Sequence, residues 1–534
     1  MKLIATPFLF LILAISADQL AAQVEDTPRS KCGFPAFTDR IERAKGNPTL
    51  RKKIAAAPAL ETSILSPSGH FRIHFDTSRT SPDLPALLDA FGQRRDSTAY
   101  QFVDSVARIF DHVWDIEIGT LGFPAPPSDN GEGGGNEYDI YIQSMTDFGV
   151  TDFVDPGTIY PGEVAPRYPS HISIDCDFGY GFRTKGLAGA RVTAAHEFFH
   201  AIQVGGYGWW DTPERYFYEL TAESMESAVY PEVKDYIHDA NDYFSSINQM
   251  SLTQNVGDFG YGRAVWGIYF RLKYGIEFIQ ATWEKVRMQR PPIALLKTIE
   301  QYGSTMRKEI SEFALWCYYT NARADSVHYF PDAKLLPRVK LADSLWLASP
   351  SYSRSTTCAS YTIQYVWLKA ASDTAVCVIV NANSDDANAH AGGVFLFALE
   401  AGQQSGAGWK QLSSSMNFRL TVSDPSQWNA FSLSNGTWMP LADAHPFPDP
   451  FRPGTGQLAF PLPSSAVAPV EVTILDAAMH FVNQWEAAPQ SQMGIWEVLW
   501  DGRDFRRNFA SSGIYFYFIR SNSYQQQGKI AVLR

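Results

Sequence analysis

The chain has 534 residues, which is enough for three or four domains of roughly 100–200 residues each. Hydrophobic residues make up 45% of it and charged residues 19%, the profile of a globular protein with a sizeable core. The net charge of −12 and the lack of a long basic run argue against a nucleic-acid partner and against binding to an acidic membrane surface.

The first residues are typical of a secretory signal peptide, which we place at residues 1–22. Lys2 precedes an apolar run over residues 3–15, and small residues follow at Ala21 and Ala22. The run is too short to span a bilayer, and no later apolar stretch of about 20 residues occurs. The alternative is a buried N-terminal strand or helix. We expect a secreted protein, extracellular or attached to the cell surface, with no transmembrane segment in the mature chain.

Residues 23–65 are polar and contain prolines, and they form an N-terminal arm or a pro-segment with a short helix near Leu50–Ala57. Residues 66–341 then mix strand and helix patterns, which indicates an α+β domain. The predicted strands are His70–Asp76, Tyr138–Gln143 and Ser170–Phe178, and the first long helix is Ala99–Trp114. Two further helices follow, separated by a loop.

The loop over residues 129–137 is rich in glycine and in acidic side chains. Asp129, Glu132 and Asp139 offer the carboxylate oxygens that Ca²⁺ prefers. The sequence leaves two interpretations open here, a calcium site and a flexible hairpin loop.

Residues 192–231 carry the most informative motif. His196 and His200 are four residues apart, which on a helix places both imidazoles on one face, where they can bind one metal ion. Glu197 follows the first histidine, as in the HExxH pattern, and can act as the base that takes a proton from a metal-bound water. Chance would produce HExxH in a chain of this length on the order of once in a hundred sequences. The alternative is a helix with two ordinary histidines.

A catalytic zinc ion usually takes three protein ligands and keeps its fourth position for water. Glu219 opens the second predicted helix and is separated from His200 by 18 residues, and we predict it as the third ligand. Glu223 and Glu226 follow four and seven residues later on the same helix face. From there they can accept the other ring N–H of a ligating histidine. The three carboxylates could instead form a solvated acidic face.

The HExxH-x18-E arrangement resembles the gluzincin clan of zinc metallopeptidases, and especially the alanyl aminopeptidase family, where the third ligand opens a NEGFAxxxE-like helix. In YELTAESME, Tyr218 and Leu220 replace the Asn and Gly of that helix, and no GxMEN-like segment occurs. The resemblance implies a zincin catalytic domain that holds Zn²⁺ and hydrolyses a protein or peptide substrate, with Glu197 as general base. The missing segment favours an endopeptidase over an aminopeptidase.

Two further positions are assigned by the same resemblance. Phe259–Gly275 resembles the gluzincin helix whose tyrosine stabilises the developing oxyanion, which points to Tyr261, with His238 as the alternative. TAAHEFFHAIQ also resembles a group of secreted bacterial metallopeptidases. In zincins the edge strand before the metal helix pairs with the substrate backbone, and His171–Asp175 is the candidate for that strand. The alternative for Tyr261 is an ordinary aromatic helix start, and the alternative for His171–Asp175 is a plain interior strand.

From residue 342 onward the helical periodicity ends, and short strand-like runs predict an all-β domain over residues 342–444. Residues 445–534 are predicted to form a second β module, a small Ig-like β-sandwich. This module resembles the bacterial Ig-like C-terminal domains related to FlgD and to the sorting domains of type IX secretion. The matching residues are Pro450, Phe451, Trp500–Arg503, Ser512–Tyr515 and Lys529. The resemblance implies that the secretion machinery is a partner of this domain.

The five cysteines cannot all pair internally. Cys358 and Cys377 lie in strand-like runs of one β region, and we predict that they form a disulfide. Cys317 lies in an apolar pattern and is predicted to be a buried free thiol. A bond between Cys32 and Cys176 is a further possibility that the sequence leaves open.

The sequence therefore predicts a secreted zinc endopeptidase, and two other classes compete with it. One is an extracellular binding or adhesion protein whose β domains do the work and whose zinc site is vestigial. The other is a carbohydrate-binding or glycan-degrading surface enzyme, which draws only on the aromatic residues and the β modules.

Overall fold

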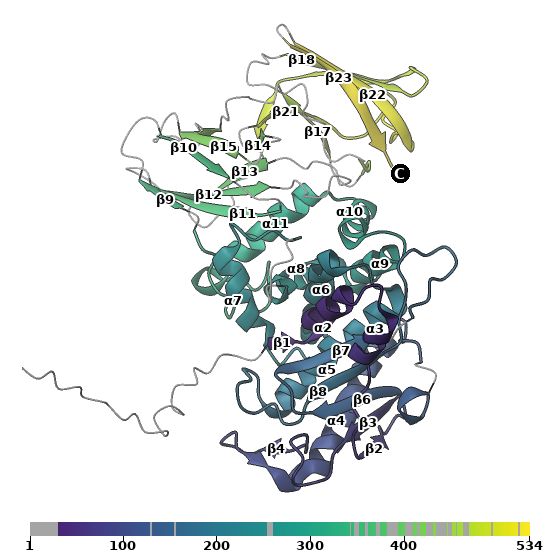
Figure 1. Cartoon of the computed structure of the whole chain (residues 1–534). Helices are drawn as coiled ribbons and strands as arrows, with labels where there is room; N and C mark the ends of the chain where they lie inside the picture. The colour runs from purple at the N-terminus through teal and green to yellow at the C-terminus, as the bar shows by residue number, and fades with distance from the viewer. Residues whose placement is uncertain are drawn as a thin grey trace, which may run out of the picture.

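The computed structural model describes residues 30–341 except 129–130, 154–155 and 254–259. Beyond these it describes separate strands between 343 and 433 with residues 361–362, then Pro446, and residues 451–534 except 455–456, 463–468, 493–494 and 522–523. The predicted signal peptide lies outside the described residues. No described helix is long and apolar enough to cross a membrane. In Figure 1 the mixed sheet and its helices lie at the bottom, and the two β-rich parts lie above them.

A six-stranded sheet forms the base of the N-terminal part, in the order β1-β7-β8-β6-β3-β2. Strands β3, β6 and β8 run parallel to one another, β7 is antiparallel to β8, and β1 pairs with β7 in parallel. The strands are β1 (Ser30–Cys32), β2 (Thr62–Leu65), β3 (Phe71–Phe75), β6 (Tyr138–Gln143), β7 (Asp147–Phe153) and β8 (Ser170–Asp175). The three strands predicted from period-two alternation are therefore confirmed as β3, β6 and β8, and the α+β class is confirmed with them.

The prediction that His171–Asp175 forms the edge strand is wrong. These residues belong to β8, which lies between β7 and β6 and is buried along its whole length. The sequence analysis missed β7, whose Gly149 and two aspartates weaken the strand pattern. Strand β7 would form the edge of this sheet if β1 did not lie against it.

Helices α4 (Ala99–Trp114) and α5 (Gly186–Ile202) pack against the sheet and against each other, and α6 (Arg215–Val229) packs on α5. The helix predicted over Ala99–Trp114 is confirmed. Helix α5 has no single apolar stripe, and it is buried on all sides from Val192 to its end, as expected of a helix in the centre of a domain. A Cβ at Gly149 would lie 2.7 Å from Thr193 Cγ2 and 3.0 Å from Glu197 Cγ, so the glycine lets β7 lie directly against α5.

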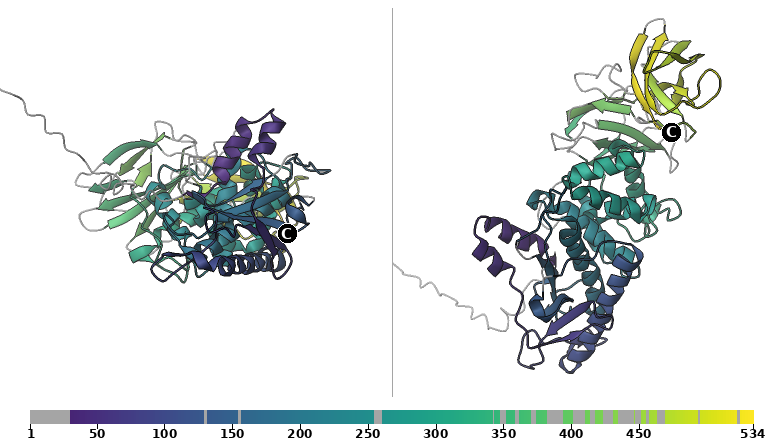
Figure 2. Two further views of the ribbon diagram at one scale, coloured as in Figure 1. Left: turned by 60° about the horizontal axis from the view of Figure 1, so that its bottom comes forward. Right: turned by 90° about the vertical axis from the view of Figure 1, so that its right-hand side faces the viewer.

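The remaining helices surround this centre. They are α2 (Phe34–Arg43), α3 (Pro48–Ile54), α7 (Tyr236–Ser246), α8 (Ala264–Tyr274), α9 (Ile276–Val286), α10 (Pro291–Gln301) and α11 (Met306–Tyr318). Phe34, Phe37 and Ile41 of α2 belong to the same hydrophobic core as α5 and α6. Helix α3 has no buried residue and stands out from the body of the molecule (Figure 2). Short strands β4 (Leu87–Leu88) and β5 (Arg94–Arg95) form a separate pair.

Two sheets follow the helices. One has the order β14-β13-β12-β11-β9 and the other β10-β15-β16. Their strands are β9 (Asp343–Trp346), β10 (Tyr352–Thr357), β11 (Ile363–Lys369), β12 (Thr374–Asn381), β13 (Val394–Glu400), β14 (Lys410–Ser413), β15 (Asn417–Val422) and β16 (Phe431–Leu433). The Tyr365 hydroxyl donates to Ala314 O at 2.7 Å and ties β11 to α11. The predicted Cys358–Cys377 disulfide falls outside what the structure describes.

The C-terminal part consists of antiparallel strands in two sheets, β17-β21-β20 and β19-β18-β22-β23. The strands are β17 (Leu458–Leu462), β18 (Val470–Asp476), β19 (Phe481–Ala487), β20 (Gln490–Gln492), β21 (Ile495–Trp500), β22 (Gly513–Ser521) and β23 (Tyr524–Val532). Both sheets contribute to one hydrophobic core around Phe460, Trp500 and Tyr517, and this core is separate from that of the helical part.

Cysteines 32, 176 and 317 are free and buried. The prediction of a buried free thiol at Cys317 is therefore confirmed. A disulfide between Cys32 and Cys176, which the sequence left open, does not form, because both cysteines are free and their sulfur atoms contact different parts of the chain. Cys32 Sγ accepts from Phe34 N at 3.3 Å, whereas the Arg94 guanidinium lies 3.5 Å from Cys176 Sγ.

Glu117 is buried in a π-helical turn, Asp115–Thr120, that follows α4. Neither of its carboxylate oxygens has a hydrogen-bond partner among the described residues. Burial raises the pKa of this carboxyl well above its ordinary value of 4.5. The folded chain therefore keeps the proton at pH values where the unfolded chain releases it, and folding becomes less favourable as the pH rises above 4.5.

Glu117→Gln removes this titration and keeps a neutral side chain of the same shape. We expect parent and variant to have similar stability near pH 4. The variant should then gain up to about 1.4 kcal/mol per pH unit until the folded carboxyl ionises. Thermal unfolding followed from roughly pH 4 to pH 8 measures this divergence, and Glu132→Gln at an exposed position is the control. A constant offset between Glu117→Gln and the parent would contradict a buried neutral carboxyl.

Candidate metal centre

The predicted ligands come together at the contact between α5 and α6. His196 and His200 lie one turn apart on α5, with ring centroids 4.8 Å apart. Glu219 on α6 faces both rings, since its Oε2 lies 3.3 Å from His196 Nε2 and its Oε1 lies 3.5 Å from His200 Nε2. All three side chains are buried.

The outer nitrogen of each imidazole has its own acceptor. His196 Nδ1 lies 2.9 Å from Glu226 Oε1, and His200 Nδ1 lies 2.7 Å from Gln203 Oε1. The Gln203 amide nitrogen donates to Tyr218 O and Thr221 Oγ1, both at 3.0 Å, so its oxygen is the atom that faces His200. Each Nδ1 therefore has an acceptor for its proton, and each Nε2 faces Glu219, where its lone pair can bind a metal ion.

Gln203 was missed in the sequence analysis. Its position three residues after His200, on the same helix face, was the available signal.

The inner atoms of this cluster are left without hydrogen bonds. His196 Nε2, His200 Nε2 and both carboxylate oxygens of Glu219 are buried, and none has a hydrogen-bond partner among the residues that the structure describes. Burial would raise the pKa of Glu219, but His200 and His196 lower it to about 2, so the carboxylate stays ionised. Burial would lower the pKa of His196, but Glu219 and Glu226 raise it to about 10. Two imidazole nitrogens and an ionised carboxylate that face one another in a buried site are ligands that suit a divalent cation such as Zn²⁺.

Cys32 is a fourth member of the cluster that the sequence analysis did not assign to it. One ligand atom from each of Cys32, His196, His200 and Glu219 lies within 4.8 Å of the others, and all four residues are buried. Burial, and then the charges of Glu197 and Glu219, raise the pKa of the Cys32 thiol well above its ordinary value. The sulfur comes from β1, far from the HExxH motif in sequence, so no spacing rule could connect the two.

Glu197, the predicted base, is fully buried beside this cluster. The Thr151 hydroxyl on β7 lies 2.8 Å from Glu197 Oε2 and 2.8 Å from Glu197 O, and it can donate to one of them at a time. Glu197 Oε1 has no hydrogen-bond partner in the described part of the chain. The strand next to the metal helix thus holds one carboxylate oxygen and leaves the other unengaged.

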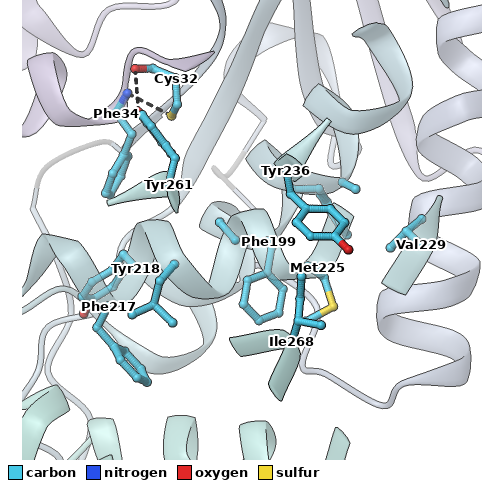
Figure 3. Close-up of a cluster of buried hydrophobic side chains, with 14 of the residues drawn as sticks. Cys32, Phe34, Phe199, Phe217, Tyr218, Met225, Val229, Tyr236, Tyr261 and Ile268 are labelled. Carbon is cyan, nitrogen blue, oxygen red and sulfur yellow. Dashed lines mark hydrogen bonds between the residues drawn. The ribbon is translucent and has the colours of Figure 1, made fainter. Parts of the chain in front are cut away.

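Tyr261 lies beside the cluster, with its ring centroid 6.0 Å from that of His196. Its hydroxyl donates to Cys32 O at 3.3 Å, as the dashed line in Figure 3 marks. His238, the alternative, is exposed on α7 and takes no part in the cluster. Arg263 is buried, and its guanidinium donates to Ser251 O at 3.0 Å and Leu252 O at 2.9 Å, which gives it a structural role.

An acidic pocket adjoins the cluster and holds Lys31. The Lys31 ammonium is buried, pairs with Glu226 Oε2 at 2.9 Å and also contacts Asp235. Although burial opposes it, the charge of Asp235 raises the pKa of Lys31 above its ordinary value. Of the two carboxylates predicted to support the ligands, Glu226 contacts His196. Glu223 instead lies in this pocket, and neither of its oxygens has a hydrogen-bond partner within the described ranges.

Of the three predicted calcium ligands, the structure describes Glu132 and Asp139. Asp129 lies outside the described residues, Glu132 is exposed, and Asp139 is buried with its Oδ1 2.7 Å from His74 Nε2. A cavity of about 300 Å³ opens beside this loop, lined by residues that include His70, Trp114 and Asp139, and it contains no member of the metal cluster. Calcium binding stays a prediction.

Two solved structures from Porphyromonas gingivalis resemble parts of the chain. One is PorZ, described as an essential bacterial surface component of the type IX secretion system. It is 15% identical with a TM-score of 0.14, over 32% of this chain and 23% of PorZ. The other is dimeric latent PorU, 13% identical with a TM-score of 0.15, over 36% of this chain and 19% of PorU. The chain thus spans less than a quarter of either protein, and likenesses of this extent carry no argument about activity.

No curated protein matches the chain. Residues 184–318 match a family of unknown function, DUF6055. That range contains α5 and α6 with His196, His200 and Glu219. The segment that matches this family is therefore the one that carries the buried histidines and glutamates of the candidate metal centre.

Proposed function

We propose that the protein is a secreted zinc-dependent endopeptidase of the gluzincin type, in which His196, His200 and Glu219 hold the metal. One observation carries the proposal. Two histidine Nε2 atoms and both Glu219 oxygens converge without hydrogen bonds, while each outer ring nitrogen has an acceptor. The HExxH-x18-E spacing and the mixed sheet under the metal helix support a zincin-like domain.

Bound zinc supplies Lewis acidity and lowers the pKa of a coordinated water. The residues of the chain then have separate tasks. Glu197 takes a proton through Oε1 while Thr151 holds its other oxygen, and it later passes that proton to the leaving amine. Tyr261 can donate a hydrogen bond to the developing oxyanion. Strand β7, once β1 leaves its edge, offers backbone groups to an extended peptide, which suits cleavage within a chain.

The metal assignment is tested with His200→Ala. We expect about one zinc per chain in the parent protein and loss of that zinc in the variant, because removal of one imidazole ligand weakens binding of the ion. Elemental analysis after dialysis measures the zinc, and casein hydrolysis with and without a chelator measures the activity. Stoichiometric zinc in His200→Ala would rule out this ligand set.

A second candidate function is favoured by Cys32. Structural zinc sites are closed by four protein ligands, whereas catalytic sites keep one position open. A permanently closed Cys-His-His-Glu site would suit an extracellular binding or adhesion protein in which zinc only stabilises the fold. Peptide hydrolysis by the chain or by any of its variants would support the peptidase and exclude a purely structural zinc site.

The C-terminal β module is proposed as an Ig-like sorting domain for type IX export. Its own hydrophobic core supports independent folding. We expect deletion from Pro446 onward to leave zinc content and hydrolysis intact and to change secretion or surface attachment. Cell fractionation together with zinc analysis of the truncated chain measures both. Normal localisation combined with lost activity would mean that this module serves catalysis and not sorting.

A further inference from the structure

The segment Ser30–Phe34 occupies the edge of the sheet beside the metal centre. Strand β1 pairs in parallel with β7, with Ser30 opposite Asp147 and Cys32 opposite Gly149, and Gly33 N donates to Gly149 O at 2.7 Å. Strand β7 is also the strand that holds Glu197 through Thr151. The backbone groups that an extended substrate would use are therefore already engaged by the protein's own N-terminal segment.

Two side chains of this segment reach the groups that the proposed reaction needs. Cys32 Sγ joins His196, His200 and Glu219 in one buried cluster whose inner nitrogen and oxygen atoms lack other partners. A tetrahedral zinc ion with bonds of about 2.0–2.3 Å holds its ligand atoms roughly 3.3–3.8 Å apart. The observed upper limit of 4.8 Å is close to that spacing. Phe34, two residues on, stacks on His200 with ring centroids 4.3 Å apart.

The backbone of Cys32 also takes the place expected of a substrate carbonyl. Its oxygen accepts a hydrogen bond from the Tyr261 hydroxyl at 3.3 Å (Figure 3). One short segment thus contacts the metal ligands through Cys32 Sγ, the Tyr261 hydroxyl through Cys32 O, and the sheet edge through Gly33 N.

Lys31 adds a second anchor in the acidic pocket. Four buried carboxylates, those of Glu223, Glu226, Asp235 and Asp239, share this region with the cations Lys31 and Arg183. Arg183 pairs with Asp239 at 2.6 Å, and among the described residues Lys31 is the lysine or arginine that pairs with both Glu226 and Asp235. If the segment withdraws, the pocket is left with uncompensated negative charge, which a basic side chain of another peptide can neutralise.

We propose that Lys31 and Cys32 close the catalytic cleft of the resting protein. Cys32 is the fourth ligand of the metal, bound as a thiolate after it releases its proton to solvent, and Lys31 fills a pocket that receives a lysine or arginine of the substrate. This inference rests on the proposed peptidase function. It makes the full chain a latent enzyme whose activation requires withdrawal of the segment.

Ligation by Cys32 is tested without any activity measurement. In the protein with Co²⁺ in place of zinc, a thiolate ligand gives a near-ultraviolet charge-transfer band. We expect this band in the parent and in the control Cys176→Ser, whose cysteine lies outside the cluster. We expect its loss in Cys32→Ala, with the visible cobalt bands retained by the other three ligands. A parent protein without the charge-transfer band would overturn the assignment of Cys32.

Latency is tested by peptide hydrolysis on the same full-length variants. Cys32→Ala should cleave casein at least about tenfold faster than the parent, because it opens the position that water needs and removes the bond that would hold the segment to the metal. An active parent that Cys32→Ala does not exceed would overturn latency and leave the peptidase proposal standing. A thiolate band in the parent with no hydrolysis by any variant would refute the peptidase and latency together, and Cys32 would then be the fourth ligand of a structural site.

The substrate preference is tested in the double variant Lys31→Ala/Cys32→Ala, which frees both the pocket and the metal position, with matched peptides that differ only by Lys or Met next to the cleaved bond. We expect kcat/KM to be at least about tenfold higher for the lysine peptide, because an unpaired buried carboxylate disfavours the apolar analogue. Asp235→Asn in the same background should reduce this ratio. Equal cleavage of the two peptides would show that the pocket serves only to anchor Lys31.

Discussion

Glu197→Gln is expected to lower hydrolysis by at least ~100-fold while the protein keeps its zinc, because the change removes the base and keeps the shape of the side chain. Thr151 can still hydrogen-bond the amide, so the variant should fold. The effect is measured as turnover and zinc content, both in the parent background and with Cys32→Ala.

Glu219→Gln is the matched comparison, since it is the same chemical change one helix away. It weakens a ligand, so it should lose zinc along with activity. The pair of variants therefore separates chemistry from metal binding. Turnover by Glu197→Gln near that of its background would refute the proposed base and make the binding-protein alternative the better one.

Lys31→Met is expected to lower the free energy of unfolding by about 3–5 kcal/mol, the usual cost of removing one partner from a buried ion pair. The reason is that Glu226 and Asp235 would keep their burial and lose their cation. Methionine fills most of the volume of the lysine stem, so the loss reports on charge more than on packing. Denaturant titration of the zinc-loaded protein measures it.

Lys45→Met is the control for this experiment. Lys45, just after helix α2, pairs with Glu42 at 2.9 Å on the surface, and both side chains are exposed. Exposed pairs add little to stability, so this variant should unfold like the parent. Equal stability of Lys31→Met and Lys45→Met would mean that the pocket carboxylates are neutral in the folded protein.

The sequence was sufficient for the parts of the site that follow helical spacing. His196 and His200 belong to one helix, and Glu219, Glu223 and Glu226 belong to the next, so a period of 3.6 residues determines which of them share a face. Helix packing then brought Glu219 and Glu226 to the histidines. The same rule could not separate Glu226, which contacts His196, from Glu223, which faces the lysine pocket.

The contributions of Lys31 and Cys32 were beyond such reasoning. Their strand has three residues, and its place in the sheet depends on pairing with β7, which was itself missed. Strand pairing over a long sequence separation is set by tertiary packing and leaves no local pattern. The parallel strands and the long helix were predicted well, because alternation and helical periodicity are strong in β3, β6 and α4.

The covered edge of β7 also bears on how the protein behaves towards copies of itself. An open sheet edge is a template for pairing with other chains, and natural proteins commonly shield it. Here β1 covers the start of β7, and α2 packs over its end, where the Phe37 and Phe153 rings lie 5.0 Å apart. Strand β1 and helix α2 therefore hinder other chains from pairing with the β7 edge of the sheet. Removal of β1 and α2 would expose the edge of β7, Asp147–Phe153, to which another extended chain can add.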